Sequence, residues 1–167
     1  MIYFAFGSNM LTCRLEGRIG RVDTLGIGRL KEYKLQFNKK SKDGSLKADA
    51  FYTGNAENEV IGVLFNINPC HKEDLDKFEG LGKGYDVKDV EVQKYNSTEV
   101  VKAFTYIARD IDQTGESLPY DWYLKLIIAG AEEHNLPEDY INRIRSVTTK
   151  QDSDSKRRDS NLLIIKK

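Results

Sequence analysis

The chain opens with a short apolar segment that ends at a glycine and leads into a helix. Residues 2–6 are apolar and aromatic, a composition typical of a buried strand. Gly7, Ser8 and Asn9 interrupt the strand, and we expect a helix over residues 10–17 with Ser8 or Asn9 as its N-cap. Unpaired N–H groups at such a turn suit a carboxylate, a phosphate or a developing oxyanion. On these residues alone, an ordinary strand-to-helix turn is the simpler interpretation.

Composition argues against several classes of protein. The 167 residues fit one domain, and the 26 basic and 26 acidic residues cancel, so no net field favours nucleic acid or an anionic membrane. No apolar run approaches the roughly 20 residues that span a bilayer. The first residues also lack the features of a signal peptide. We therefore expect a cytoplasmic protein that binds neither nucleic acid nor a membrane.

Cysteine and histidine are too few and too widely spaced for a metal centre. Cys13 and Cys70 have no closely spaced partner, which favours reduced thiols over a disulfide, and His71 and His134 are far apart. The glycines at 26–28 and 80–84 lack the spacing of a dinucleotide site or a P-loop. We expect no metal and no cofactor, so ordinary side chains and backbone must carry any chemistry.

The order of the expected elements indicates an α+β fold. Strands are expected within residues 2–6, 22–37, 48–53, 60–66, 85–95 and 100–107, and further helices from Asn68-Pro69, Leu118 and Leu136-Pro137. Segments 48–53 and 60–66 are expected to pair as a hairpin, as are 85–95 and 100–107. Hairpin connections favour a largely antiparallel sheet, open or closed, over alternating βαβ layers.

The C-terminal end differs in composition from the rest. We expect one domain over residues 1–150 and a charged tail over 151–167. Residues 151–160 are almost all polar and are expected to be disordered or loosely attached. Residues 161–165 are apolar, so this part is expected to dock onto its own domain or onto a second subunit, which would make a homodimer.

The opening segment closely resembles a family signature. It reads Tyr3-Phe4-Ala5-Phe6-Gly7-Ser8-Asn9-Met10-Leu11-Thr12. This is similar to the N-terminus of the γ-glutamylcyclotransferases, in which a Tyr-Gly-Ser-Asn segment cradles the γ-glutamyl part of the substrate. The resemblance implies that residues 3–9 bind this group, although Phe6 replaces the family's tyrosine and removes a hydroxyl. It covers residues 2 to about 147 and implies a small mixed β-barrel surrounded by helices.

Glu79 is the leading candidate for a catalytic residue. On position alone it is an ordinary solvated glutamate at a helix end. However, Phe78-Glu79-Gly80, followed by Gly84-Tyr85, resembles the family's Glu-Gly element, in which the glutamate is the catalytic acid/base. A γ-glutamyl amide carries its own nucleophile, because its α-amine can attack the γ-carbonyl and close a five-membered lactam. Such intramolecular reactions gain about 7–11 kcal/mol. One proton carrier then suffices, and we expect its carboxylate to be partly buried by aromatic neighbours.

Two tyrosines complete the expected site. Tyr123 matches a substrate-contacting tyrosine in the family's long C-terminal helix, and Tyr106 lies where the family also has a tyrosine. On the residues alone, a core or surface ring of an amphipathic helix is the simpler interpretation of Tyr123, and Tyr106 could belong either to the site or to the core. Asn9 is expected to act as a cap and Arg14 to be an exposed helix residue, and nothing nearby marks Cys13 as an activated thiol.

The resemblance implies a cyclotransferase that converts γ-glutamyl dipeptides to 5-oxoproline and a free amino acid. A γ-glutamylamine or another γ-glutamyl amide is an alternative substrate. A non-catalytic module of the same fold, binding a small ligand or a protein, is a second alternative, although the presence of Glu79 argues against it. A phosphate-binding protein that uses the Gly7–Asn9 turn is weaker still, because we expect no basic residue to adjoin this turn.

Overall fold

The computed structural model describes residues 1–166. In that part of the chain, strands and α-helices alternate irregularly before a helical C-terminal third. In chain order they are β1 (Ile2–Ala5), α1 (Thr12–Ile19), β2 (Asp23–Lys31), β3 (Tyr33–Lys40), β4 (Leu46–Tyr52), β5 (Glu59–Asn66), α2 (Lys72–Glu79), β6 (Tyr85–Lys94), β7 (Val100–Ala108), α3 (Asp121–Glu133), α4 (Glu138–Arg145) and α5 (Ser155–Leu162). Three short 3₁₀ turns accompany them, namely η1 (Ser8–Met10), η2 (Pro69–His71) and η3 (Leu163–Lys166).

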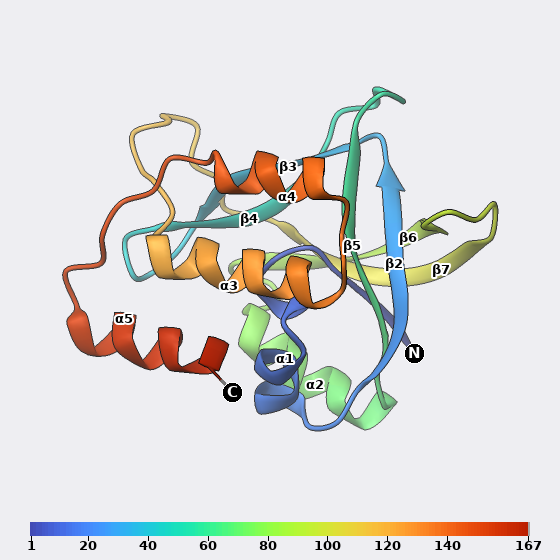
Figure 1. Cartoon of the computed structure of the whole chain (residues 1–167), viewed down its shortest axis with the longest axis horizontal. Coiled ribbons are helices and arrows are strands. Elements are labelled where there is room, and N and C mark those ends of the chain that lie inside the picture. Colours follow the sequence, from blue (N-terminus) through green and yellow to red (C-terminus); the bar gives the residue numbers. More distant parts are fainter. Residues whose placement is uncertain (167) are drawn as a thin grey trace.

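Five strands close into a barrel in the order β1-β5-β2-β6-β7 (Figure 1). Neighbouring strands run antiparallel, except that the ring closes through a parallel contact between β1 and β7, where Tyr3 pairs with Phe104. Closure removes the free sheet edges that an open sheet of this size would expose. The expectation of an α+β fold with a small mixed, largely antiparallel barrel is confirmed.

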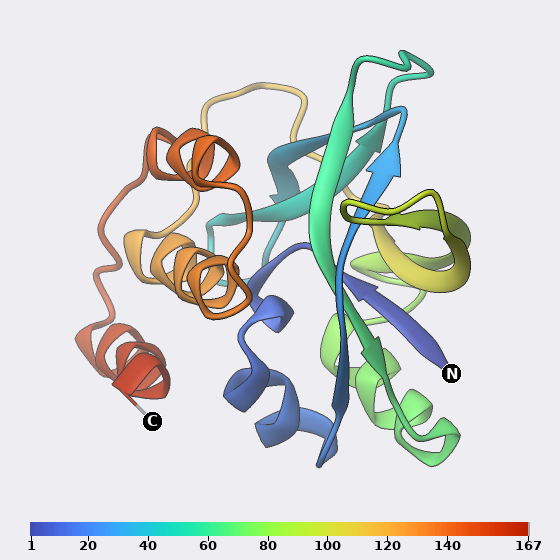
Figure 2. The same cartoon turned by 45° about the vertical axis from the view of Figure 1, so that its right-hand side comes forward.

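One expected hairpin forms and the other does not. Strands β6 and β7 pair along their length, as predicted. Strands β4 and β5 do not pair with each other, so the hairpin expected over 48–66 is wrong: β4 pairs with β3 in a separate two-stranded sheet, and β5 lies between β1 and β2 (Figure 2). The physical reason is burial. Six of the eight residues of β5 are buried, which is typical of a central strand with a neighbour on both sides rather than of an edge strand.

The helices surround the barrel on two sides. In both views α3, α4 and α5 lie together beside it, while α1 and α2 lie below (Figures 1 and 2). Helix α3 packs closely against η1 because it has a glycine at the contact: a Cβ added at Gly130 would lie 2.4 Å from Leu11 N. None of the described helices is long and apolar enough to cross a lipid bilayer.

The first helix starts later than expected. A 3₁₀ turn covers Ser8 to Met10, and α1 begins only at Thr12, with Leu11 at its N-cap and no side-chain cap. Ser8 and Asn9 are therefore not caps of this helix. Both are buried, and their side chains bond elsewhere. In contrast, Asn68 does cap η2, accepting a hydrogen bond from Cys70 N, as predicted.

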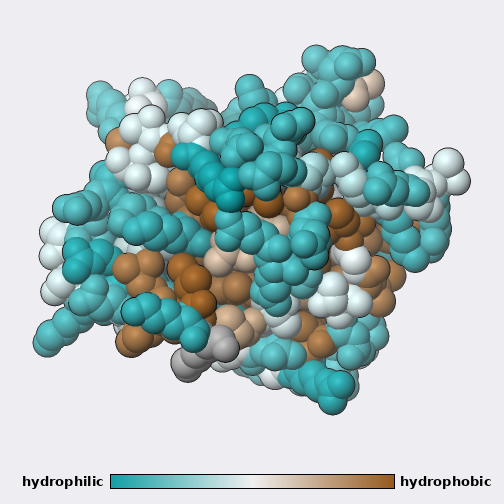
Figure 3. All heavy atoms as spheres, viewed as in Figure 1, coloured by the Kyte–Doolittle hydropathy of each residue, from teal (hydrophilic) through white to brown (hydrophobic). Residues whose placement is uncertain are grey.

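The C-terminal segment is ordered, contrary to expectation. Helix α5 is capped by Asp154, and the buried Asp152 accepts a hydrogen bond from Trp122 Nε1 at 2.8 Å. Beyond the helix, Cys13 Sγ donates to Ile164 O at 3.4 Å. The polar residues 151–160 gave no sign of this order, because it depends on long-range contacts, and the apolar Leu162, Ile164 and Ile165 that follow pack against the core. The tail therefore docks onto its own domain. In Figure 3, hydrophobic groups are visible among the hydrophilic ones in the region of α3 and α5.

Candidate active site

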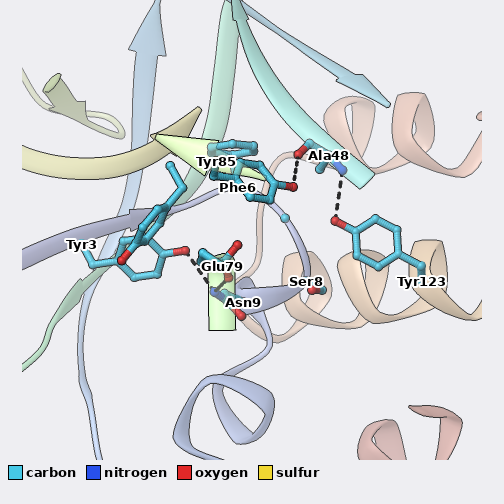
Figure 4. Close-up of a pocket in the computed structure, with 10 residues that line it drawn as sticks. Tyr3, Phe6, Ser8, Asn9, Ala48, Glu79, Tyr85 and Tyr123 are labelled. Atoms are coloured by element: carbon cyan, nitrogen blue, oxygen red, sulfur yellow. Dashed lines mark hydrogen bonds between the residues drawn. The ribbon is translucent and has the colours of Figure 1, made fainter. Parts of the chain in front are cut away.

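A small pocket lies where the turn after β1 meets the end of α2 (Figure 4). Its lining residues come from both halves of the chain and are mostly aromatic or polar. They are Tyr3, Phe6, Gly7, Ser8, Asn9, Ala48, Glu79, Tyr85, Tyr106 and Tyr123. The structure thus brings together most of the residues that the sequence nominated.

Glu79 is the only carboxylate among these lining residues. It is the last residue of α2, and Gly80 follows with φ 67°, a left-handed conformation that ends the helix there. Asn9 Nδ2 donates to its Oε1 at 2.8 Å, and Arg18 Nη1 donates to the same atom at 3.0 Å. The side chain is 14% exposed, which agrees with the expected partial burial. No described residue donates a hydrogen bond to Oε2, so this oxygen can accept a proton.

Asn9 connects three parts of the site. Its Nδ2 donates to Tyr3 Oη at 3.1 Å as well as to Glu79, and its Oδ1 accepts from Arg18 Nη1 at 2.7 Å. The residue is 4% exposed, so its amide is committed to these partners. Asn9 is therefore not the local cap that the sequence suggested but a buried link that orients the Glu79 carboxylate.

Sequence reasoning missed Arg18. Its guanidinium forms an ion pair with Glu79 and lies 5.4 Å from the centre of the Phe78 ring. A signal was present, because Arg14 and Arg18 are four residues apart, a spacing that places both on one face of a helix. That face turns toward the Gly7–Asn9 segment.

Arg14 is half-buried beside the turn, not exposed as expected. Its Nε donates to Ser8 Oγ at 3.1 Å, and its Nη1 donates to Asn161 Oδ1, in α5, at 3.2 Å. Burial lowers the pKa of Arg14 to about 10, so it remains charged at neutral pH. The expectation that no basic residue adjoins the turn is therefore wrong, because chain folding brings back two residues from the next helix.

Two tyrosines hold the backbone of Ala48, a lining residue that the sequence gave no reason to select. Tyr85 Oη donates to Ala48 O at 2.8 Å, and Ala48 N donates to Tyr123 Oη at 3.1 Å (Figure 4). Burial raises the pKa of Tyr123 to about 12 and the pKa of Tyr85 well above its ordinary value. Both hydroxyls therefore stay neutral at physiological pH. They fix β4 against the pocket and contribute no charge.

Tyr3 and Tyr106 form another wall of the pocket. Their rings meet edge to face, with centroids 5.8 Å apart. Tyr106 Oη donates to Asp76 Oδ1 at 2.7 Å, and burial raises the pKa of both phenols. Tyr106 thus lies in the site and also links β7 to α2.

Phe4 and Ala5 do not line the pocket. Both are almost fully buried in the core, and Ala5 pairs with Val63 of β5. Phe4 O accepts a hydrogen bond from Thr105 Oγ1 at 2.7 Å. These two residues support the turn from within the barrel, whereas Phe6 reaches the pocket with a ring that has no hydroxyl.

Comparisons with known proteins identify the family to which the chain is similar. Residues 59–144 match the model of the AIG2-like family. Proteins named gamma-glutamylcyclotransferase from Bos taurus and Homo sapiens are 32% and 29% identical to the chain, and each match covers 87% of this chain and 78% of the relative. A solved structure named gamma-glutamyl cyclotransferase superposes with a TM-score of 0.85 at 26% identity, covering 99% of this chain and 98% of that one. On this similarity in sequence and structure, the chain belongs to the γ-glutamylcyclotransferase family of enzymes.

Proposed function

We propose that the enzyme cyclises γ-glutamyl amino acids, releasing 5-oxoproline and a free amino acid, in the cytoplasm. The observation that carries this proposal is the hydrogen bonding of the Glu79 carboxylate. Its carboxylate lies in the pocket with Oε1 held by Asn9 and Arg18, while Oε2 receives no hydrogen bond from the described residues. A carboxylate fixed by one oxygen can accept and return a proton through the other without reorienting.

The reaction needs only a proton carrier and a bent substrate. Glu79 takes a proton from the substrate's α-ammonium group, and the amine attacks the γ-carbonyl carbon. The tetrahedral intermediate collapses as the bond to the leaving nitrogen breaks, and Glu79 returns its proton to that nitrogen. A second proton, shed as the attacking nitrogen becomes an amide, completes the ammonium group of the released amino acid. Holding the substrate bent contributes about 7–11 kcal/mol, which accounts for the absence of a nucleophilic side chain from the scheme.

The turn after β1 is suited to the negatively charged parts of the substrate. The N–H groups of Ser8 and Asn9 lie in the first turn of a 3₁₀ helix, where they have no acceptor within the helix. Arg14 donates to Ser8 Oγ, so the hydroxyl proton of Ser8 is free to point at a ligand. These donors can hold the α-carboxylate of the substrate or the oxyanion of the intermediate.

The test is to incubate the purified protein with γ-glutamyl-alanine and to measure 5-oxoproline and alanine by liquid chromatography and mass spectrometry. We expect the two products in equal amounts. Turnover of γ-glutamylamines with none of γ-glutamyl-alanine would change the substrate class, and turnover of neither would overturn the proposal.

A further inference from the structure

The basic side chains next to the pocket differ in whether a carboxylate forms an ion pair with them. Arg18 is paired with Glu79 at 3.0 Å, and Lys47, which precedes the lining residue Ala48, is paired with Asp43 at 2.7 Å. Arg14 and Lys39 have no carboxylate of residues 1–166 within 4.0 Å. A partly desolvated cation without a counter-ion favours the binding of an anion. These two cations therefore mark where negative charge on a substrate would be stabilised.

Lys39 lies beside the glycine-rich loop that follows Glu79. Its Nζ is 5.0 Å from the centre of the Tyr85 ring, which lines the pocket. A Cβ added at Gly84 would lie 2.9 Å from both Cε and Nζ of Lys39, so the ammonium group rests directly on the backbone of this loop. Lys39 is half-buried, and burial lowers its pKa, while the charge of Glu79 acts in the opposite direction.

The number and placement of these cations fit a substrate with two carboxylates. Arg14 adjoins Ser8, in the turn proposed to hold the glutamyl group, and Lys39 adjoins Tyr85, on a different element. A γ-glutamyl amino acid carries one carboxylate on its glutamyl part and one on its leaving group, whereas a γ-glutamylamine carries only the first.

We propose that Lys39 binds the carboxylate of the leaving amino acid and thereby selects γ-glutamyl amino acids over γ-glutamylamines. The flexible four-carbon stem of a lysine allows the ammonium group to follow leaving groups of different length. This inference rests on the proposed function and adds the residue that sets its leaving-group preference.

Two substrates that differ only in this charge test the inference. γ-Glutamyl-alanine and γ-glutamyl-alaninamide release the same 5-oxoproline, and kcat/KM is measured for both with the same assay. We expect the wild type to prefer the acid by about tenfold or more, the value of a charge-assisted hydrogen bond. Equal turnover of the acid and the amide would overturn the inference and leave the proposed function standing. If the enzyme releases 5-oxoproline from neither substrate, both the inference and the proposed function are overturned.

The matched variants are Lys39→Met and Lys40→Met. Lys40 is the next residue of the same strand, and its exposed side chain pairs with Asp110 at 3.6 Å. We expect Lys39→Met to lose about tenfold in kcat/KM on the acid, with turnover of the amide unchanged, and Lys40→Met to keep the wild-type preference. Unchanged turnover of γ-glutamyl-alaninamide by Lys39→Met would also show that this variant is folded. If Lys39→Met proves unfolded by circular dichroism, Lys39→Gln is measured in its place. A folded variant that affects both substrates equally, or neither, would refute the role of Lys39.

Discussion

Asn9 Nδ2 lies 2.8 Å from Glu79 Oε1, although the two residues are 70 positions apart in the chain. The contact joins the turn after the first strand to the end of α2. Arg18 bonds the same oxygen and also Asn9, and Asn9 in turn bonds Tyr3, so the carboxylate is held directly by two residues and through Asn9 by the first strand.

Replacing Glu79 by glutamine should abolish most of the activity while leaving binding largely intact. Glutamine has nearly the same shape but cannot carry the proton, so we expect kcat on γ-glutamyl-alanine to fall by about 10²–10⁴-fold with a small change in KM. The control is Glu73→Gln in the same helix, where the side chain is 83% exposed. Similar rates for wild type and Glu79→Gln would remove this residue from the mechanism.

Arg18 and Asn9 should act on the rate through Glu79. Arg18→Met and Asn9→Ala each remove a donor to Oε1, so each should lower kcat by about tenfold and change KM less. Both side chains act on the same oxygen of Glu79. The increase in activation free energy of the double variant should therefore be smaller than the sum of the increases in the two single variants. The exposed Arg21 provides a control through Arg21→Met. Strict additivity, or an effect on KM alone, would contradict a positioning role.

Short-range sequence patterns predicted the strands and helices better than they predicted which strands pair with each other. Strands β6 and β7 are close in sequence, so alternation and the intervening turn were enough to pair them. The pairing of β5 with β1 and β2 depends on burial at both edges of the strand, and residue type alone does not specify which strands will lie there.

The residues of the candidate site were selected by family resemblance more than by chemistry. The resemblance selected Glu79 and the turn after β1, but it included Phe4 and Ala5, which lie in the core, and omitted Arg18 and Ala48. The four-residue spacing of Arg14 and Arg18 indicates a shared helix face, but only the folded chain shows that Arg18 lies next to Glu79. The role of Ala48 comes from its backbone, which its side chain does not reveal.

Removing the hydroxyl of Tyr123 should destabilise the fold. Tyr123→Phe leaves the buried N–H of Ala48 without an acceptor, which costs about 1–3 kcal/mol of unfolding free energy. Urea denaturation monitored by circular dichroism measures the loss. Tyr52→Phe is the matched control, because this ring is 54% exposed, and it should change the unfolding free energy by less than about 0.5 kcal/mol. Equal stability of Tyr123→Phe and Tyr52→Phe would show that the bond to Ala48 is dispensable.

The attachment of the C-terminal segment to the rest of the fold should weaken at acid pH. Arg157 donates hydrogen bonds to both oxygens of the buried Asp152, and this holds the pKa of Asp152 well below its ordinary value. A carboxylate with a depressed pKa stabilises the fold fully above its unfolded value of about 4, and this contribution is lost as the pH falls further. Asp152→Asn should therefore lower the urea midpoint by a constant amount from pH 8 to pH 5, and the difference from wild type should shrink below about pH 4.

The single tryptophan makes this change observable. Trp122 Nε1 donates to Asp152 Oδ2 at 2.8 Å, so its fluorescence should report when α5 leaves α3. Asp159→Asn is the control, because this carboxylate is 62% exposed and pairs with the neighbouring Arg158. Since Arg14 bonds both Asn161 of α5 and Ser8 of the pocket, loss of the tail should also lower turnover of γ-glutamyl-alanine in Asp152→Asn. A tail that detaches with no change in turnover would show that Arg14 holds Ser8 without help from α5.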